Sequence, residues 1–408
     1  MYYINVFRVI CLLALLTSCQ SEPSSKPESA IPTITLNPKQ AAQTFRLDSV
    51  VTSVHYLQLG SENESIITQP LRLMLWDEFM LMYDARGVPL GSRAVLFTDE
   101  GKALGQVGRR GKGPGEYNSN TDARLNPFTQ TVDILSNDSR GKTISSIIQY
   151  ELPSLSYLRT LPMADVYLSQ FTPVTADQYL LYHPEYHAQH PDWNFVFSRF
   201  DPKAGELLDQ VSPLPESMEE GKSVLNTWQA FTGEPNRPVL SNWNLDTAYQ
   251  FVDKEQGLAK RYAFTFAGVE QGDLTYGRGE ELETLLYEGQ ACCIDPYIET
   301  ENFIFGSYRY QTYWGESFLY SKRTGKLVQY TYDGLTNPFN GLDFDLPVGA
   351  HYEQDELIFA KLPGSLAKKL EREGESFLPE ARKDLQALTD TLDREGNYVL
   401  IFYKLAEI

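Results

Sequence analysis

The residues best suited to do chemistry lie in one short segment, which contains His183, Glu185, His187, His190 and Asp192. Three of the chain's five histidines are within eight residues of each other there. Neutral imidazoles and carboxylates are good transition-metal ligands, and a loop can bring them together on zinc. The segment has no H-E-x-x-H spacing, and Pro184 and Pro191 argue against one helix that presents the ligands. Two interpretations stay open: a metal site formed by His183, Glu185, His187 and His190, or a loop that is either solvated or in contact with a ligand.

A second candidate is the aromatic segment SYRYQTYWGES, which we expect to lie on a loop. Aromatic rings beside an arginine suit the apolar faces and hydroxyl groups of sugars, or a peptide. The alternative is that the rings pack against neighbouring parts of the fold. The candidate ligand-binding residues here are Tyr308, Arg309, Tyr310, Tyr313 and Trp314.

A third candidate is the glycine loop that contains Gly108, Gly111, Gly113 and Gly115, with Arg109, Arg110 and Lys112 between them. Successive backbone N–H groups of such a loop can bind an anion, and Arg109 and Arg110 would add positive charge. The loop lacks the G-K-[ST] sequence of a Walker A motif. A purely structural turn is the alternative that the sequence favours. No nucleophile motif is recognisable, and no cofactor other than a transition metal such as zinc is indicated.

The chain begins with a signal for export. Arg8 precedes an apolar run from Val9 to Leu16, and Leu16-Thr17-Ser18-Cys19 follows. The apolar run is too short to span a bilayer. This pattern is typical of a secretory signal over residues 1–18. The residues before the cysteine resemble a bacterial lipobox, and this resemblance implies that Cys19 carries a lipid. We therefore expect a protein anchored by lipid in the cell envelope of a Gram-negative bacterium, either periplasmic or facing the surface.

Composition limits the partners of the mature chain. The formal charge of −19 becomes −20 when residues 1–18, with Arg8, are removed. An acidic protein without a basic patch is a poor partner for nucleic acid. Residues 19–42 are rich in Ser, Pro, Glu and Lys, and predict a flexible tether. The adjacent Cys292 and Cys293 are either buried small residues in a strand or a reactive thiol pair, and the sequence leaves both open.

Strand hairpins recur along the rest of the chain. The unit Ala94–Tyr117 reads as a strand, a glycine turn at Thr98–Lys102, a returning strand and the glycine loop. Similar hairpins follow at about fifty-residue spacing, as in the four-stranded blades of a propeller. The last strand, NYVLIFYKLAEI, has no partner after it, so we expect Thr44–Leu59 to pair with it and close the ring. Residues 364–395 carry helical leucine spacing and predict a helical insertion in the last blade.

The unit Phe97–Tyr117 resembles the repeat of NHL-type six-bladed propellers, through its D-x-x-G-K turn and its G-x-x-G-x-G-P-G-E-aromatic loop. The mature chain is also similar to the bacterial six-bladed propeller lipoproteins. These resemblances imply an all-β, six-bladed β-propeller over residues 43–408, and they imply no chemistry.

Three functions remain possible at this stage. The first is a membrane-tethered, non-catalytic propeller that binds a glycan, a peptide or a protein partner through the face that carries its long connections. The second is a metal-assisted lyase or hydrolase centred on the segment from His183 to His190. The third is a structural subunit of an outer-membrane complex. A propeller fold does not decide between them.

Overall fold

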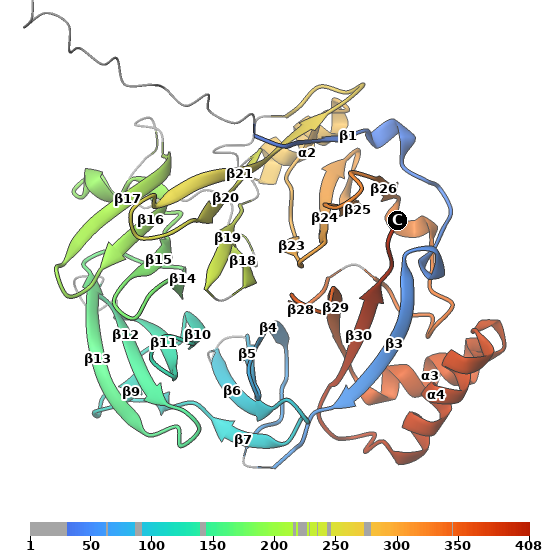
Figure 1. Ribbon diagram of the computed structural model, residues 1–408, viewed down its shortest axis with the longest axis horizontal. Helices are drawn as coiled ribbons and strands as arrows, with labels where there is room; N and C mark the ends of the chain where they lie inside the picture. Colours follow the sequence, from blue (N-terminus) through green and yellow to red (C-terminus); the bar gives the residue numbers. More distant parts are fainter. Residues whose placement is uncertain are drawn as a thin grey trace, which may run out of the picture. The chain divides into compact units, whose positions relative to one another are not determined.

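Six sheets of mainly antiparallel strands, the blades, stand around a central axis and form a β-propeller (Figure 1). The computed structural model describes residues 31–62, 64–85, 92–138, 144–214, 218, 227, 229–234, 236–242, 246–272, 279–344 and 346–408. The propeller is the compact unit Thr33–Ile408. The predicted signal peptide and Cys19 lie outside the described residues.

The first three blades each contain four strands that follow the chain order from the axis outward. Blade 1 has β4 (Pro70–Trp76), β5 (Phe79–Asp84), β6 (Arg93–Thr98) and β7 (Ala103–Gln106). Blade 2 has β10 (Asp122–Asn126), β11 (Thr131–Asp138), β12 (Ile144–Glu151) and β13 (Tyr157–Ala164). Blade 3 has β14 (Gln170–Pro173), β15 (Tyr179–Tyr182), β16 (Phe195–Asp201) and β17 (Glu206–Pro213).

The last three blades carry additions to this plan. Blade 4 has β18 (Phe231–Glu234), β19 (Arg237–Leu240), β20 (Thr247–Phe251), β21 (Leu258–Phe266) and, outside them, β1 (Thr33–Leu36). Blade 5 has β22 (Ala291–Cys292), β23 (Tyr297–Glu299), β24 (Phe303–Tyr310), β25 (Thr312–Ser321) and β26 (Leu327–Tyr330). Blade 6 has β28 (Gly349–His351), β29 (Glu356–Lys361), β30 (Val399–Leu405) and β3 (Val51–Gln58).

Short elements lie between the strands and between the blades. Two parallel pairs lie outside the sheets, β2 (Phe45–Arg46) with β27 (Leu335–Thr336) and β8 (Arg109–Arg110) with β9 (Glu116–Tyr117). The α-helices are α2 (Gly279–Tyr287), α3 (Pro363–Glu373) and α4 (Pro379–Thr391). Single 3₁₀ turns are η1 (Pro38–Gln40), η2 (Leu47–Ser49), η3 (Pro191–Trp193), η4 (Tyr332–Gly334) and η5 (Gly374–Ser376).

Burial between blades explains the composition of the strands. Middle strands such as β5 and β29 read as continuous apolar runs because both of their faces pack against a neighbouring blade. Blades 1 and 2, for example, share a core that contains Leu81, Leu96, Ile134 and Ile148. Outer strands such as β17 are only partly buried, and their sequence is correspondingly mixed. Cys292 and Cys293 are both buried beside α2. Cys292 ends β22, as the first of their two interpretations predicts, whereas Cys293 follows the strand.

The ring closes as the sequence predicts. Strand β3 runs antiparallel to β30, with Val54 opposite Tyr403 and Tyr56 opposite Ile401. Segments from the two ends of the chain therefore lie side by side in blade 6 (Figure 1). The helical insertion is also confirmed: α3 and α4 follow β29, and Leu366 and Leu385 are buried against the core of blade 6.

The prediction of a tether up to residue 42 is wrong for residues 33–42. Strand β1 pairs in parallel with β21 on the outer edge of blade 4, with Ile34 opposite Phe264. Ile34 and Leu36 are buried in the core between blades 4 and 5. Two alternating apolar residues in a Ser- and Pro-rich stretch give little local signal, because the strand depends on a partner more than two hundred residues away.

Removal of β1, β2 and β3 should destabilise the propeller. A protein of residues 60–408 loses the outer strand of blade 6 and leaves the hydrogen-bonding groups of β30 unpaired. We expect it to aggregate, or to melt more than about 10 °C below a protein of residues 31–408 in differential scanning calorimetry. Equal melting temperatures for the two proteins would contradict the observed closure.

Candidate functional site

The candidate metal segment contains one deeply buried histidine. His183 has no exposed surface, its Nε2 lies 2.7 Å from Ser198 Oγ, and its ring meets Trp193 edge-on. Burial lowers the pKa of His183 from 6.5 to about 3, because the charged imidazolium would lose its hydration there. His183 is therefore a neutral packing residue of blade 3.

The other predicted metal ligands form no metal site with His183. His190 is exposed, and the backbone of His187 is fixed by Asn194, which accepts from His187 N at 2.8 Å and donates to His187 O at 3.1 Å. Among the described residues, no group of three or more His, Cys, Asp or Glu side chains is placed to hold a metal ion. The segment from His183 to His190 is included in that search, so the structure does not bring the four candidate ligands together.

The aromatic segment is a tight hairpin, and the expectation of a loop is wrong. Strands β24 and β25 are separated by Gln311 alone, which takes a left-handed φ of 59°. Tyr308 is fully buried and donates to Glu316 Oε2 at 2.6 Å, while Tyr310 packs at the edge of the core between blades 4 and 5. The side chains of Tyr313 and Trp314 are outside the described set. The segment has no Gly or Pro at its turn, so a long loop was a plausible but incorrect interpretation.

The glycine loop holds an anion that belongs to the chain itself. Glu116 Oε2 accepts from Lys112 N at 2.9 Å and from Gly113 N at 2.8 Å, and Arg109 Nε donates to Glu116 Oε1 at 2.7 Å. These hydrogen bonds lower the pKa of Glu116. A Cβ at Gly111 would lie 2.0 Å from the Glu116 carboxylate, so a side chain there would displace this carboxylate from its present position. The geometry favours the structural alternative, with Arg109 engaged and Arg110 exposed at its edge.

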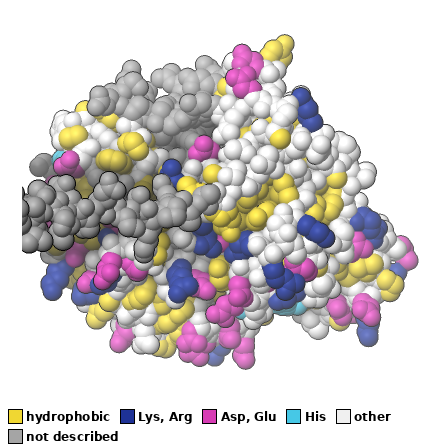
Figure 2. Space-filling model, turned by 45° about the horizontal axis from the view of Figure 1, so that its top comes forward, with side chains coloured by type: hydrophobic (Ala, Val, Ile, Leu, Met, Phe, Trp, Pro, Cys, Tyr) yellow, Lys and Arg dark blue, Asp and Glu magenta, His cyan; other side chains and the backbone are white. Residues whose placement is uncertain are grey.

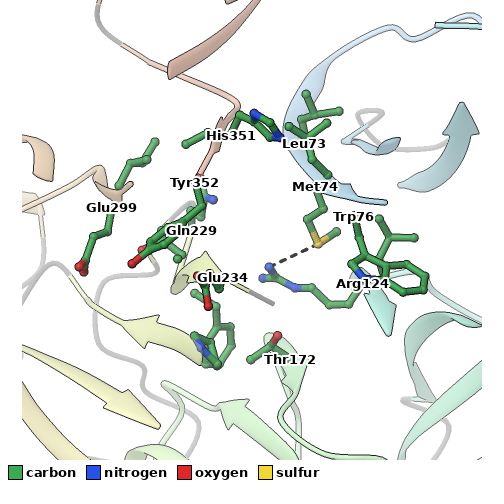
Figure 3. Close-up of a pocket in the computed structure, with 18 of the residues that line it drawn as sticks. Leu73, Met74, Trp76, Arg124, Thr172, Gln229, Glu234, Glu299, His351 and Tyr352 are labelled. Carbon is green, nitrogen blue, oxygen red and sulfur yellow. Dashed lines mark hydrogen bonds between the residues drawn. The ribbon is translucent and has the colours of Figure 1, made fainter. Parts of the chain in front are cut away.

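A pocket of about 240 Å³ lies on the propeller axis (Figure 3). Its lining comes from the innermost strands of all six blades and from turns between first and second strands, such as Asp77 and Glu353. The pocket therefore opens on the face of the short turns. The sequence analysis favoured the opposite face, which carries the long connections, because a sequence does not show which residues meet on the axis.

Arg124 forms the floor of the pocket together with the buried ionic cluster that lies behind it. Asp122 accepts from the guanidinium groups of both Arg72 and Arg124, the latter at 3.2 Å. Gln170 Oε1 accepts from Arg72 Nη1 at 2.6 Å, and its Nε2 donates to Thr227 O at 2.8 Å. These residues belong to blades 1, 2 and 3 and to the segment before blade 4. Two guanidinium groups thus meet one carboxylate at Asp122, and Thr227 Oγ1 connects the cluster to the buried carboxylate of Asp295 at 2.7 Å.

Arg124 is the part of the cluster that faces the pocket. Its side chain extends from β10 toward the centre (Figure 3), and the residue is 4% exposed. Its Nε is bonded to Asp122, but Nη1 meets only Met74 Sδ at 3.7 Å and Nη2 meets Gln170 Oε1 at 3.5 Å. Sulfur is a weak acceptor, and 3.5 Å is long for a hydrogen bond. Burial lowers the pKa of Arg124 to about 10, which still leaves it charged at neutral pH.

The walls and mouth of the pocket differ from its floor. Trp76, Phe231, Tyr352 and Leu125 supply apolar and aromatic surface. Glu299 is buried in the wall and neutralised, since it accepts from Arg261 Nε at 3.0 Å and from Lys322 Nζ at 2.9 Å. Glu234 is half-buried and lies in the pocket opposite Arg124 (Figure 3).

The sequence did contain one signal for this site. Arg72 and Arg124 each stand between apolar residues inside a strand, in Leu71-Arg72-Leu73 and Ala123-Arg124-Leu125. A charged residue in an otherwise buried strand needs a partner or a role. The partner Asp122 could be proposed only after the first strands of blades 1 and 2 had been aligned.

The fold and the pocket define the chain as a six-bladed β-propeller with a polar axial site. The chain belongs to the family described as "Domain of unknown function (DUF4934)", whose model matches residues 31–404. A search of curated proteins gives no match.

One solved structure supports the fold. It is a protein of Bacteroides fragilis NCTC 9343 named "Putative exported protein", with 17% identity and a TM-score of 0.68, over 92% of this chain and 98% of that chain. A more distantly similar structure is a member of the DUF4221 family from Bacteroides vulgatus ATCC 8482, with 11% identity and a TM-score of 0.47, over 88% of this chain and 97% of that chain. Within the described residues, no helix has the length and apolar character needed to cross a membrane.

His183 should make the propeller less stable in mild acid. Its pKa is lowered on folding, so the unfolded chain takes up the proton first, and stability falls as the pH drops below 6.5 toward about 3. Between pH 7.5 and pH 5, this group should remove about 2 kcal/mol from the free energy of unfolding. Urea unfolding of His183→Gln should show that much less loss than the parent protein.

The exposed His190 provides the control for this measurement. His190→Gln should keep the acid sensitivity of the parent protein. The same pH dependence in the parent protein and in His183→Gln would show that His183 is not buried as a neutral group.

Proposed function

We propose that this protein is an exported, lipid-anchored binding protein whose axial pocket takes a small organic acid. The observation that carries the proposal is the buried guanidinium of Arg124, which faces the pocket with N–H groups that no oxygen of the described residues meets at a short distance. A buried polar donor without a good acceptor is costly. A ligand oxyanion would supply that acceptor.

The shape of the donor selects the ligand group. A guanidinium presents parallel N–H groups that match the two oxygens of a carboxylate. Asp122 already holds the Nε side, which leaves Nη1 and Nη2 directed toward the pocket. Trp76, Phe231 and Tyr352 offer apolar surface for the remainder of the molecule.

The buried guanidinium of Arg124 is suited to recognise a ligand inside the pocket, and not to attract anions to the surface of the protein. The whole chain has a formal charge of −19, and acidic and basic side chains are interspersed on the face shown in Figure 2. The positive charge at the floor is therefore a local feature, held by Arg72 and Arg124 against one carboxylate. Its effect is greatest at short range inside the pocket, where water screens it least.

Export and anchoring rest on separate support. The residues from Arg8 to Cys19 have the pattern of a lipoprotein signal, and the similar Bacteroides fragilis protein carries the word "exported" in its name. A lipid on Cys19 would hold the propeller at a membrane of the cell envelope. A binding protein in that position would meet small molecules outside the cytoplasm.

Arg124→Met should abolish selectivity for acids. Isothermal titration calorimetry of the full chain with a panel of aliphatic and aromatic monocarboxylates, each paired with its neutral amide, should give acids that bind and amides that do not. The variant should weaken acid binding by about 10- to 100-fold, the value of a charged hydrogen-bonded contact. Asp122 keeps Arg72 and the N–H groups of Ala123 and Phe171 as donors in this variant, so the fold should persist.

Arg110→Met is the matched control, because Arg110 is exposed at the glycine loop. It should leave acid binding unchanged, and thermal unfolding should show that both variants are folded. A panel in which no acid binds better than its amide would refute the proposal.

A further inference from the structure

The pocket carries opposite charges at its two ends. Its floor is the cluster with two arginines and one aspartate, and the mouth is formed by carboxylates on the short-turn face. We propose that the ligand is a zwitterion of dipeptide size, which enters with its carboxylate first and leaves its ammonium group at the mouth. This proposal rests on the proposed function and adds the class of ligand to it.

The carboxylates at the mouth come from three blades. Asp77 follows β4, Glu234 ends β18, and Glu353 follows β28. Within the described part of the chain, none of the three forms an ion pair, whereas Glu299 in the same wall is neutralised by Arg261 and Lys322. Three carboxylates without an ion pair give the mouth a negative charge, which favours a ligand cation there.

Of these three carboxylates, Glu234 is the one best placed to bind a ligand. Asp77 and Glu353 are exposed, but Glu234 is half-buried and its side chain is directed into the pocket opposite Arg124 (Figure 3). An ion pair at a half-buried position is screened less than one in open solvent. Glu234 is therefore the carboxylate expected to contact the ammonium group.

Apolar surface separates the two charged ends. Phe231 begins the strand that Glu234 ends. The Arg124 guanidinium carbon lies over the Phe231 ring, 5.5 Å from the ring centre. Trp76 and Tyr352 line the pocket from blades 1 and 6. A ligand that satisfies all three zones has a carboxylate, an apolar group and an ammonium in that order. A short peptide with an apolar C-terminal residue has this arrangement.

Three probes of nearly equal size separate the contributions of the ends. Alanyl-phenylalanine carries both charges, N-propionyl-phenylalanine lacks only the ammonium, and alanyl-phenylalanine amide lacks only the carboxylate. Calorimetric titration of the full chain should rank the first probe above the second by about threefold to tenfold. The amide should bind weakest, because it cannot pair with Arg124.

The variant Glu234→Gln locates the ammonium contact. It should weaken alanyl-phenylalanine by the same threefold to tenfold and leave N-propionyl-phenylalanine unchanged. Glu206→Gln, on the outer strand β17, is the matched control and should change neither. Thermal unfolding of each variant should match that of the parent protein, since Glu234 makes no ion pair with any residue that the structure describes.

Each result has a defined meaning. Equal affinity for alanyl-phenylalanine and N-propionyl-phenylalanine, with both dependent on Arg124, would overturn the zwitterion and leave the acid-binding proposal intact. Binding of simple monocarboxylates without binding of the dipeptide would have the same meaning. If no acid bound the parent protein better than its amide, both proposals would be overturned.

Discussion

The carboxylate of Asp122, shared between Arg72 and Arg124, is the interaction on which the centre of the propeller depends. Burial of three charges is expensive, and the cost is offset only when every charged group is hydrogen-bonded. Asp122 meets that condition, since it also accepts from the backbone of Ala123 and Phe171. The cluster therefore holds the innermost strands of blades 1, 2 and 3 in one arrangement. Asp122 accepts from Arg124 through Nε alone, so the Nη1 and Nη2 groups of Arg124 remain available to a ligand in the pocket.

The closed ring gives this cluster its rigidity. A pocket assembled from six separate strands keeps its shape only if the blades cannot move apart, and β3 prevents that by completing blade 6 with residues from near the start of the chain. Strand β1 likewise adds an N-terminal strand to a later blade, on the outer edge of blade 4. The N-terminal segment therefore braces two blades, and the binding residues can sit on strands instead of on loops.

The architecture was predictable because its signals are local. Glycine turns such as that at Gly101, apolar runs such as β5 and the leucine spacing of α4 each follow from neighbouring residues. The site was not predictable for the opposite reason. Arg72 and Gln170, which meet at the floor, are 98 positions apart, and no periodicity relates them. The same limitation hid β1, whose four residues acquire a partner only in the folded ring.

The most conspicuous motifs of the sequence turn out to serve the scaffold, and the reason is physical. The glycine loop binds an anion, but that anion is Glu116, so the N–H groups are already satisfied. His183 is buried as a neutral ring against Ser198 and Trp193. Tyr308 gives its hydroxyl to Glu316. For the glycine loop and for Tyr308, the chain supplies the partner that a ligand would otherwise provide, and His183 has no exposed surface that a ligand could reach. Arg124 differs from them because its outer N–H groups meet only a sulfur and a distant amide oxygen, and that unmet bonding capacity is what marks a place for a ligand.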